Sequence, residues 1–238
     1  MTRHVLLNNV EHRNLRVITR HSAALGDETM SALTFPAEFR NIQAHYPIVF
    51  AKVQDETFAP LALFGLREKQ NLFLKGDVWD AHYLPMMVDR QPFLIGNSPN
   101  GKVIHIDLDS PRVSQVEGER VFLEDGGNSE FLNHVSGVMG TLDEGLQGTP
   151  AFIAAIQEYN LLESFAIDIQ YRDRAKHRFA GCYTIEEERL AKLDGAALGK
   201  LHERGYLQAI YMVVASLSNF RGLIERANQL NADARLSG

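Results

Sequence analysis

The sequence predicts an α+β protein, with a mostly antiparallel sheet in its first half and helices plus a β-hairpin in its second half. Three observations support this fold class. Short β-branched and aromatic runs fill residues 1–127, apolar residues recur at helical spacing in residues 128–238, and regular strand–helix alternation is missing. A polar turn at residues 124–128 separates the two halves, which we expect to form one compact domain.

The strands of the first half are predicted from β-prone runs that end at turn residues. These runs are residues 15–18, 46–53, 60–66 and 72–74, with a short helix expected over residues 35–43. Residues 102–108 alternate cleanly between apolar and polar side chains. A strand there would place Val103, His105 and Asp107 on one face.

Two helices are predicted directly after the boundary between the halves. Asn128 or Ser129 can cap the first helix, whose apolar side chains recur at helical spacing. Thr149 and Pro150 match an N-cap followed by a proline at the first helical position, so a second helix should run from there to about Tyr159.

A hairpin and a long helix complete the predicted fold. Residues 165–183 contain two alternating runs separated by a polar turn, which is typical of a β-hairpin. Thr184 and Glu187 have the spacing of a capping box for a following helix. Residues 206–230 carry an apolar stripe of one phase, so a long amphipathic helix is expected, and its stripe is the candidate surface for a homo-oligomer or a partner.

Composition limits the class of protein. The 238 residues carry a formal net charge of −6, which argues against nucleic-acid binding because phosphate recognition needs basic surface. The single cysteine, Cys182, cannot form an internal disulfide. The first residues lack the apolar core of a secretory signal, and no run of about twenty apolar residues is present. We therefore expect a soluble, cytoplasmic protein without a transmembrane segment.

An aromatic stretch at residues 71–96 contains the candidate ligand site. Its candidate residues are Trp79, His82, Tyr83, Arg90 and Phe93. Amphipathic aromatics beside a planar guanidinium can hold a carboxylate, a phosphate or a peptide backbone. The alternative is structural: Arg90 would bond to Asp89 or to main chain, beneath a Trp79 that fills the core.

A metal site is a weaker candidate. His105 and Asp107 on one strand face could form a two-histidine, one-carboxylate iron site if His134, His177 or His202 supplied the third ligand. The alternative is a hydrogen-bonded structural pair. No other cofactor is expected.

Cys182 is a third chemical candidate. A nucleophilic cysteine needs a base and an electropositive setting, and His177, the nearest histidine in sequence, would lie on the opposite face of the strand. A buried structural thiol is the simpler interpretation.

Several blocks of this sequence, in this order, resemble the bacterial SapC family. They are Tyr-Pro-Ile-Val-Phe at residues 46–50 and the segments at residues 65–73, 79–85, 90–93, 122–126, 181–188 and 216–217. The resemblance covers residues 8–230, and it does not concern the transporter permease of similar name, which would need spanning helices.

The resemblance supplies no catalytic residues and implies a non-catalytic accessory that binds a partner protein or a small ligand. Genes of this family are described beside TonB-dependent receptors, halogenase-like enzymes and cupin-like proteins, which suggests an uptake or halogenase-like system. Two alternatives stay open: a metal-dependent, oxygenase-like enzyme using His105 and Asp107, and a structural component of a surface layer.

Overall fold

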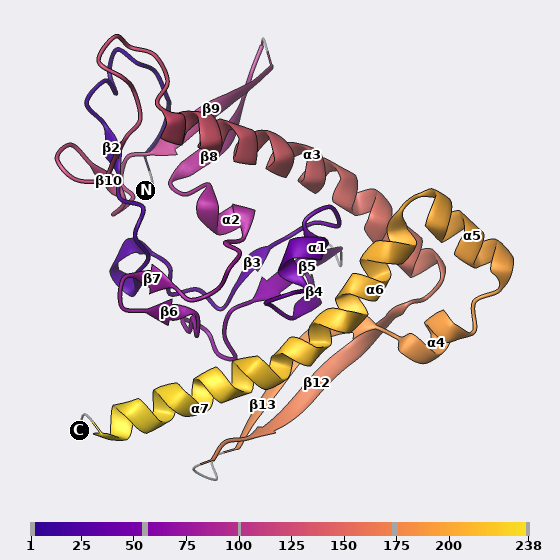
Figure 1. Cartoon of the computed structure of the whole chain (residues 1–238). Helices are drawn as coiled ribbons and strands as arrows, with labels where there is room; N and C mark the ends of the chain where they lie inside the picture. The colour runs from indigo at the N-terminus through magenta and orange to yellow at the C-terminus, as the bar shows by residue number, and fades with distance from the viewer. Residues whose placement is uncertain (1–2, 54–56, 100, 173–175, 237–238) are drawn as a thin grey trace. The chain divides into compact units, whose positions relative to one another are not determined.

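The computed structural model describes residues 3–53, 57–99, 101–172 and 176–236. Its contacts divide the chain into two compact units. Unit 1 comprises Met1–Glu28, Leu74–Asp80 and Met86–Glu144, and unit 2 comprises Thr29–Phe73, Ala81–Pro85 and Gly145–Gly238. The units interleave along the chain, so they do not follow the division at residues 127 and 128. Strands dominate the first half and helices the second, and the predicted α+β class is confirmed (Figure 1).

Unit 1 contains two three-stranded antiparallel sheets, with the orders β1-β9-β8 and β10-β2-β11, and the ribbon β6-β7. Its elements are β1 (His4–Leu6), β2 (Arg16–Val17), η1 (Ala23–Leu25), β6 (Leu74–Lys75), β7 (Val78–Trp79), α2 (Met86–Asp89), β8 (Phe93–Ser98), β9 (Gly101–Asp107), β10 (Val113–Ser114), β11 (Glu119–Arg120) and the first part of α3 (Glu130–Glu158). β9 confirms the strand predicted from alternation, and its Ile106 is completely buried.

Unit 2 is built on a five-stranded antiparallel sheet with the order β12-β13-β4-β5-β3. Its elements are β3 (Ser31–Leu33), α1 (Phe39–Ile42), β4 (Ile48–Lys52), β5 (Phe58–Leu63), the second part of α3, β12 (Leu162–Gln170), β13 (Lys176–Ile185), α4 (Glu187–Ala191), α5 (Gly195–Glu203), α6 (Tyr206–Ser216), η3 (Leu217–Asn219) and α7 (Phe220–Leu236). The predicted hairpin is confirmed. α1 is shorter than predicted, because Phe35 and Pro36 begin a turn in which Glu38 N donates to Phe35 O.

The prediction of two helices between residues 128 and 159 is wrong, because α3 is continuous through Pro150. The cap at Ser129 is confirmed, since its Oγ accepts a hydrogen bond from Leu132 N (3.1 Å). Proline at position 150 removes one helical N–H, and Thr149 Oγ1 turns back to donate to Gly145 O (2.8 Å). The buried stripe continues past the proline, so packing outweighs its local preference.

The predicted capping box is also wrong. Thr184 lies within β13, its hydroxyl is buried, and its Oγ1 makes no hydrogen bond to any described residue. α4 begins after Glu186, which provides no side-chain cap. Sheet pairing of Thr184 with Glu163 holds the residue in extended conformation and overrides the local signal.

The predicted long helix is confirmed as α6, η3 and α7 in sequence. Its segment Tyr206–Ala232 is long and apolar enough to cross a membrane, with a window of mean hydropathy 1.2, although polar residues interrupt its apolar side chains. About a third of that window is buried inside the protein (33%). One such helix is weak evidence for a membrane span, because core helices can have the same length and composition.

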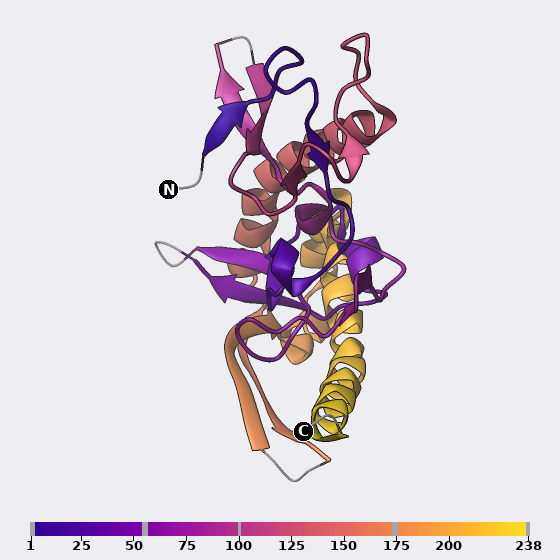
Figure 2. The same ribbon diagram turned by 90° about the vertical axis from the view of Figure 1, so that its left-hand side faces the viewer.

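One end of the β12–β13 hairpin extends beyond the rest of the sheet, beside α7 (Figures 1 and 2). In the part of the chain that the structure describes, β13 pairs with β4 only at Tyr183 and Phe50. The extended part packs on α7 instead: the Phe220 ring lies 5.1 Å from that of Phe165 and 5.7 Å from that of Phe179.

Candidate functional site

Unit 2 contains a cavity of about 380 Å³ at the start of β5 and the second half of α3. It is lined by Leu33, Thr34, Thr57, Phe58, Ala59, Pro60, Leu146, Thr149, Pro150, Ile153, Ala154 and Gln157. Phe58 and Pro60 share one face of the sheet with Phe50, whose ring lies 6.4 Å from that of Phe152 on α3. The cavity therefore lies between this face of the sheet and α3.

A buried hydrogen-bond chain orients the polar wall of this cavity. Thr34 Oγ1 donates to Glu38 Oε2 (2.6 Å), and Tyr83 Oη donates to Glu38 Oε1 (2.9 Å). Tyr46 Oη in turn donates to Tyr83 O (2.5 Å). Thr34 and Glu38 are buried, so their geometry is fixed by these partners rather than by water. Tyr83, one of the predicted ligand residues, thus supports the cavity wall.

His82, the other predicted residue in unit 2, is exposed and lies beside His45, with 6.0 Å between the ring centres. Burial lowers the pKa of His45, and the charge of His82 lowers it further. This pair does not line the cavity described above.

Unit 1 contains three of the predicted ligand residues, Trp79, Arg90 and Phe93, and each is buried or half-buried. Trp79 is buried (7% exposed) and its indole lies edge-on to His21, with 5.6 Å between ring centres. Arg90 Nη1 donates to Phe93 O, and burial lowers the pKa of Arg90. The Phe93 side chain is completely buried. This main-chain anchor matches the structural alternative, and a ligand role for these residues stays a prediction.

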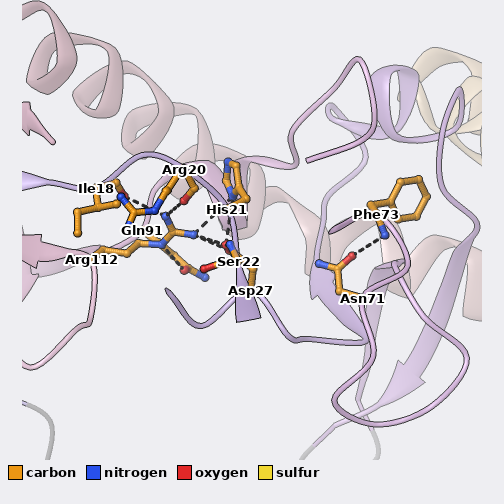
Figure 3. Close-up of polar contacts among 9 residues, drawn as sticks. All are labelled: Ile18, Arg20, His21, Ser22, Asp27, Asn71, Phe73, Gln91 and Arg112. Atoms are coloured by element: carbon orange, nitrogen blue, oxygen red, sulfur yellow. Dashed lines mark hydrogen bonds and ion pairs between the residues drawn. The ribbon is translucent and has the colours of Figure 1, made fainter. Parts of the chain in front are cut away.

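A buried ion pair that the sequence did not indicate lies beside Trp79's neighbour His21 (Figure 3). Arg112 Nη2 donates to Asp27 Oδ1 and Oδ2 (2.5 and 2.6 Å), and both side chains are buried. Arg112 Nη1 donates to the carbonyls of Ile18 (3.0 Å) and Arg20 (2.9 Å). These bonds tie the residue 18–27 segment to Arg112, so the pair acts as an anchor for unit 1.

The same close-up draws a separate contact within unit 2. Asn71 Oδ1 accepts a hydrogen bond from Phe73 N (3.0 Å), as is usual where asparagine stabilises a turn (Figure 3).

A second cavity, of about 320 Å³, lies in unit 1 against the first part of α3. It is lined by Ile95, Lys102, Val103, Ile104, Ser136, Met139, Gly140, Asp143 and Glu144. Lys102 Nζ pairs with Asp143 Oδ1 (3.3 Å) among these residues. The five predicted ligand residues line neither cavity.

The predicted metal ligands His105 and Asp107 lie on β9, and no third ligand joins them among the described residues. Across the described ranges, no group of three His, Cys, Asp or Glu side chains is arranged to hold a metal ion. His105 packs over Gly96, where an added Cβ would be 2.5 Å from its Cδ2. Asp107 Oδ1 accepts from Asp109 N (3.1 Å), which is a turn contact.

Two of the three predicted third ligands, His134 and His177, contact other groups. His134 Nε2 lies 2.9 Å from Asp89 Oδ2, and His177 Nε2 lies 2.8 Å from Leu66 O. His202 is exposed on α5. The geometry therefore gives the iron site no further support.

Burial raises the pKa of the Cys182 thiol to about 11, which opposes formation of the nucleophilic thiolate. We expect native Cys182 to react with an aromatic disulfide reagent at pH 8 at least about a hundredfold more slowly than in the urea-unfolded chain. The rate should keep rising with pH up to about 11, where half of the thiol is ionised. Absorbance of the released thiolate measures both; equal native and unfolded rates would contradict the burial.

The fold and the cavity together define an α+β protein with an apolar, ligand-sized cavity. A family model, SapC, matches residues 7–223, and the chain belongs to the SapC family. No curated protein and no solved structure gives a significant match. The resemblance inferred from the sequence is confirmed over most of the chain.

Proposed function

We propose that this SapC-family protein is a non-catalytic binding protein whose unit 2 cavity holds a small, mainly apolar ligand. The observation that carries the proposal is the cavity of about 380 Å³, within the range of about 300–1,000 Å³ that is usual for ligand sites. In this role the protein acts as an accessory that holds the ligand for a partner protein.

The chemistry of the lining supports binding rather than reaction. Most lining side chains are aliphatic or aromatic, and the polar ones are Thr34, Thr57, Thr149 and Gln157. None of the described lining residues is an acid, a base or a cysteine. Hydroxyl and amide groups set the orientation of a ligand, whereas general acid–base catalysis needs titratable groups.

Filling the cavity is expected to abolish binding. Ala154 lines the cavity and is exposed, so a phenylalanine there can enter the space without displacing the core. The neutral fluorophore N-phenyl-1-naphthylamine should bind the unaltered protein at one saturable site. Ala154→Phe should weaken its binding at least about tenfold in a fluorescence titration, because the added ring occupies the ligand's volume.

Ala151→Phe is the matched control, since Ala151 is exposed on the same helix and does not line the cavity. This variant should bind the fluorophore as the unaltered protein does. Equal binding by both variants, or no saturable binding at all, would contradict the proposed site.

A further inference from the structure

Phe58, the first residue of β5, directs its main-chain N–H and C=O toward the side of β5 on which β3 lies. In an antiparallel ladder, alternate residues of a strand bond to its two neighbours. Leu63 N donates to Pro47 O (3.0 Å), so the odd-numbered residues of β5 bond to β4. Thr34 N donates to Pro60 O (3.1 Å), so the even-numbered residues face β3. Phe58 therefore presents its N–H and C=O on the β3 side.

The chain of β3 departs before it reaches Phe58. After Thr34 it enters the turn in which Glu38 N donates to Phe35 O (2.9 Å). Continued by two residues, the register would place Pro36 opposite Phe58, and proline has no N–H to donate. On this side of the sheet, no hydrogen bond joins the Phe58 main chain to another described residue.

The cavity of unit 2 adjoins this unpaired position. Phe58 and Thr34 both line it, as does Leu146 of α3. Pro150 has no N–H to give to Leu146 O, so that carbonyl lacks its usual helical donor. Phe58 thus presents one free N–H and one free C=O at a strand edge beside an apolar cavity. Leu146, which lines the same cavity, has a carbonyl without its helical donor.

We infer that the apolar group held by the cavity is the side chain of an extended peptide residue that pairs with Phe58, at the position that β3 leaves open. This inference rests on the proposed function, because the same cavity receives one apolar side chain of the peptide. The residue that carries it lies opposite Phe58, donates its N–H to Phe58 O and accepts from Phe58 N–H. No described lining residue is charged, so this side chain is neutral.

The test uses acetyl-leucine-N-methylamide, a single blocked residue, and the full chain labelled with nitrogen-15. One residue is the length that the unpaired position allows, because Thr34 already lies opposite Pro60. Titration should shift the Phe58 amide resonance saturably and slow its hydrogen exchange at least tenfold. An analogue with an N-methyl group on the leucine should bind at least tenfold more weakly, because it has lost the N–H that pairs with Phe58 O.

The outcomes separate this inference from the proposed function. Equal binding of both peptides, or fluorophore binding without peptide binding, overturns strand addition and leaves the cavity site in place. Loss of both fluorophore and peptide binding overturns both. Peptide binding that disappears in Ala154→Phe, persists in Ala151→Phe and depends on the leucine N–H supports both.

Discussion

Replacing Asp27 by alanine is expected to lower the free energy of unfolding by about 3–5 kcal/mol, because the Arg112 guanidinium would stay buried without its counter-charge. Both side chains are almost completely inaccessible (3% and 0% exposed for Arg112 and Asp27). Asp27 also accepts from Ser22 N (2.9 Å), so the substitution removes a second buried bond. Urea unfolding followed by fluorescence measures the loss, and Trp79, the single tryptophan, lies in the same unit.

Two controls test whether buried charge is the cause. Asp168→Ala removes the partner of Arg178 from an exposed pair (66% and 78% exposed) and should change stability by less than about 1 kcal/mol. The double variant Asp27→Ala, Arg112→Met removes both buried charges and should be more stable than Asp27→Ala alone. A double variant no more stable than Asp27→Ala would assign the loss to packing instead.

Gly145→Ala is expected to destabilise the protein by about 1–3 kcal/mol, through overpacking. A Cβ at Gly145 would lie 2.1 Å from Cδ2 of Phe35, a ring that is completely buried. A rigid ring in a packed core cannot yield as the end of a flexible side chain would. Unfolding in urea, followed by far-ultraviolet circular dichroism, measures the change.

Gly148→Ala, three residues further along the same helix, should raise the free energy of unfolding instead of lowering it. Nothing lies within 4 Å of a Cβ added at Gly148. Alanine is better than glycine in a helix interior by about 0.5–1 kcal/mol, so this variant should gain roughly that much stability. If both substitutions lowered the free energy of unfolding, contact with Phe35 would not be the reason why alanine destabilises α3.

The sequence predicted the elements whose signal is local and repeated. Alternation located β9 and the β12–β13 hairpin, and the apolar stripe located the helices from Tyr206 onward. The continuity of α3 was missed, because Thr149 and Pro150 carry a strong local start signal that the packing of the helix overrides. Short strands such as β3 have too few residues to show a period.

The candidate sites were harder to predict, since their residues meet only in the folded chain. Arg112 and Asp27 are 85 residues apart in sequence, and neither lies in a recognisable motif. The unit 2 cavity combines β3, β5 and α3, so no single stretch indicates it. Tyr83 is predicted as an aromatic ligand residue, whereas its hydroxyl donates to Glu38, behind Thr34 on the cavity wall.

The single pairing between β13 and β4 gives unit 2 a graded stability. Away from this pairing, the hairpin is held to α7 by the ring of Phe220 and by the bond from Arg172 N to Asn228 Oδ1 (2.9 Å), and to Leu66 O by His177 Nε2 (2.8 Å). That end can open without breaking the ladder of β4 with β5. An insertion there would leave the ladder of β4 with β5 intact, which makes this end of the hairpin a place to attach a label or a tag.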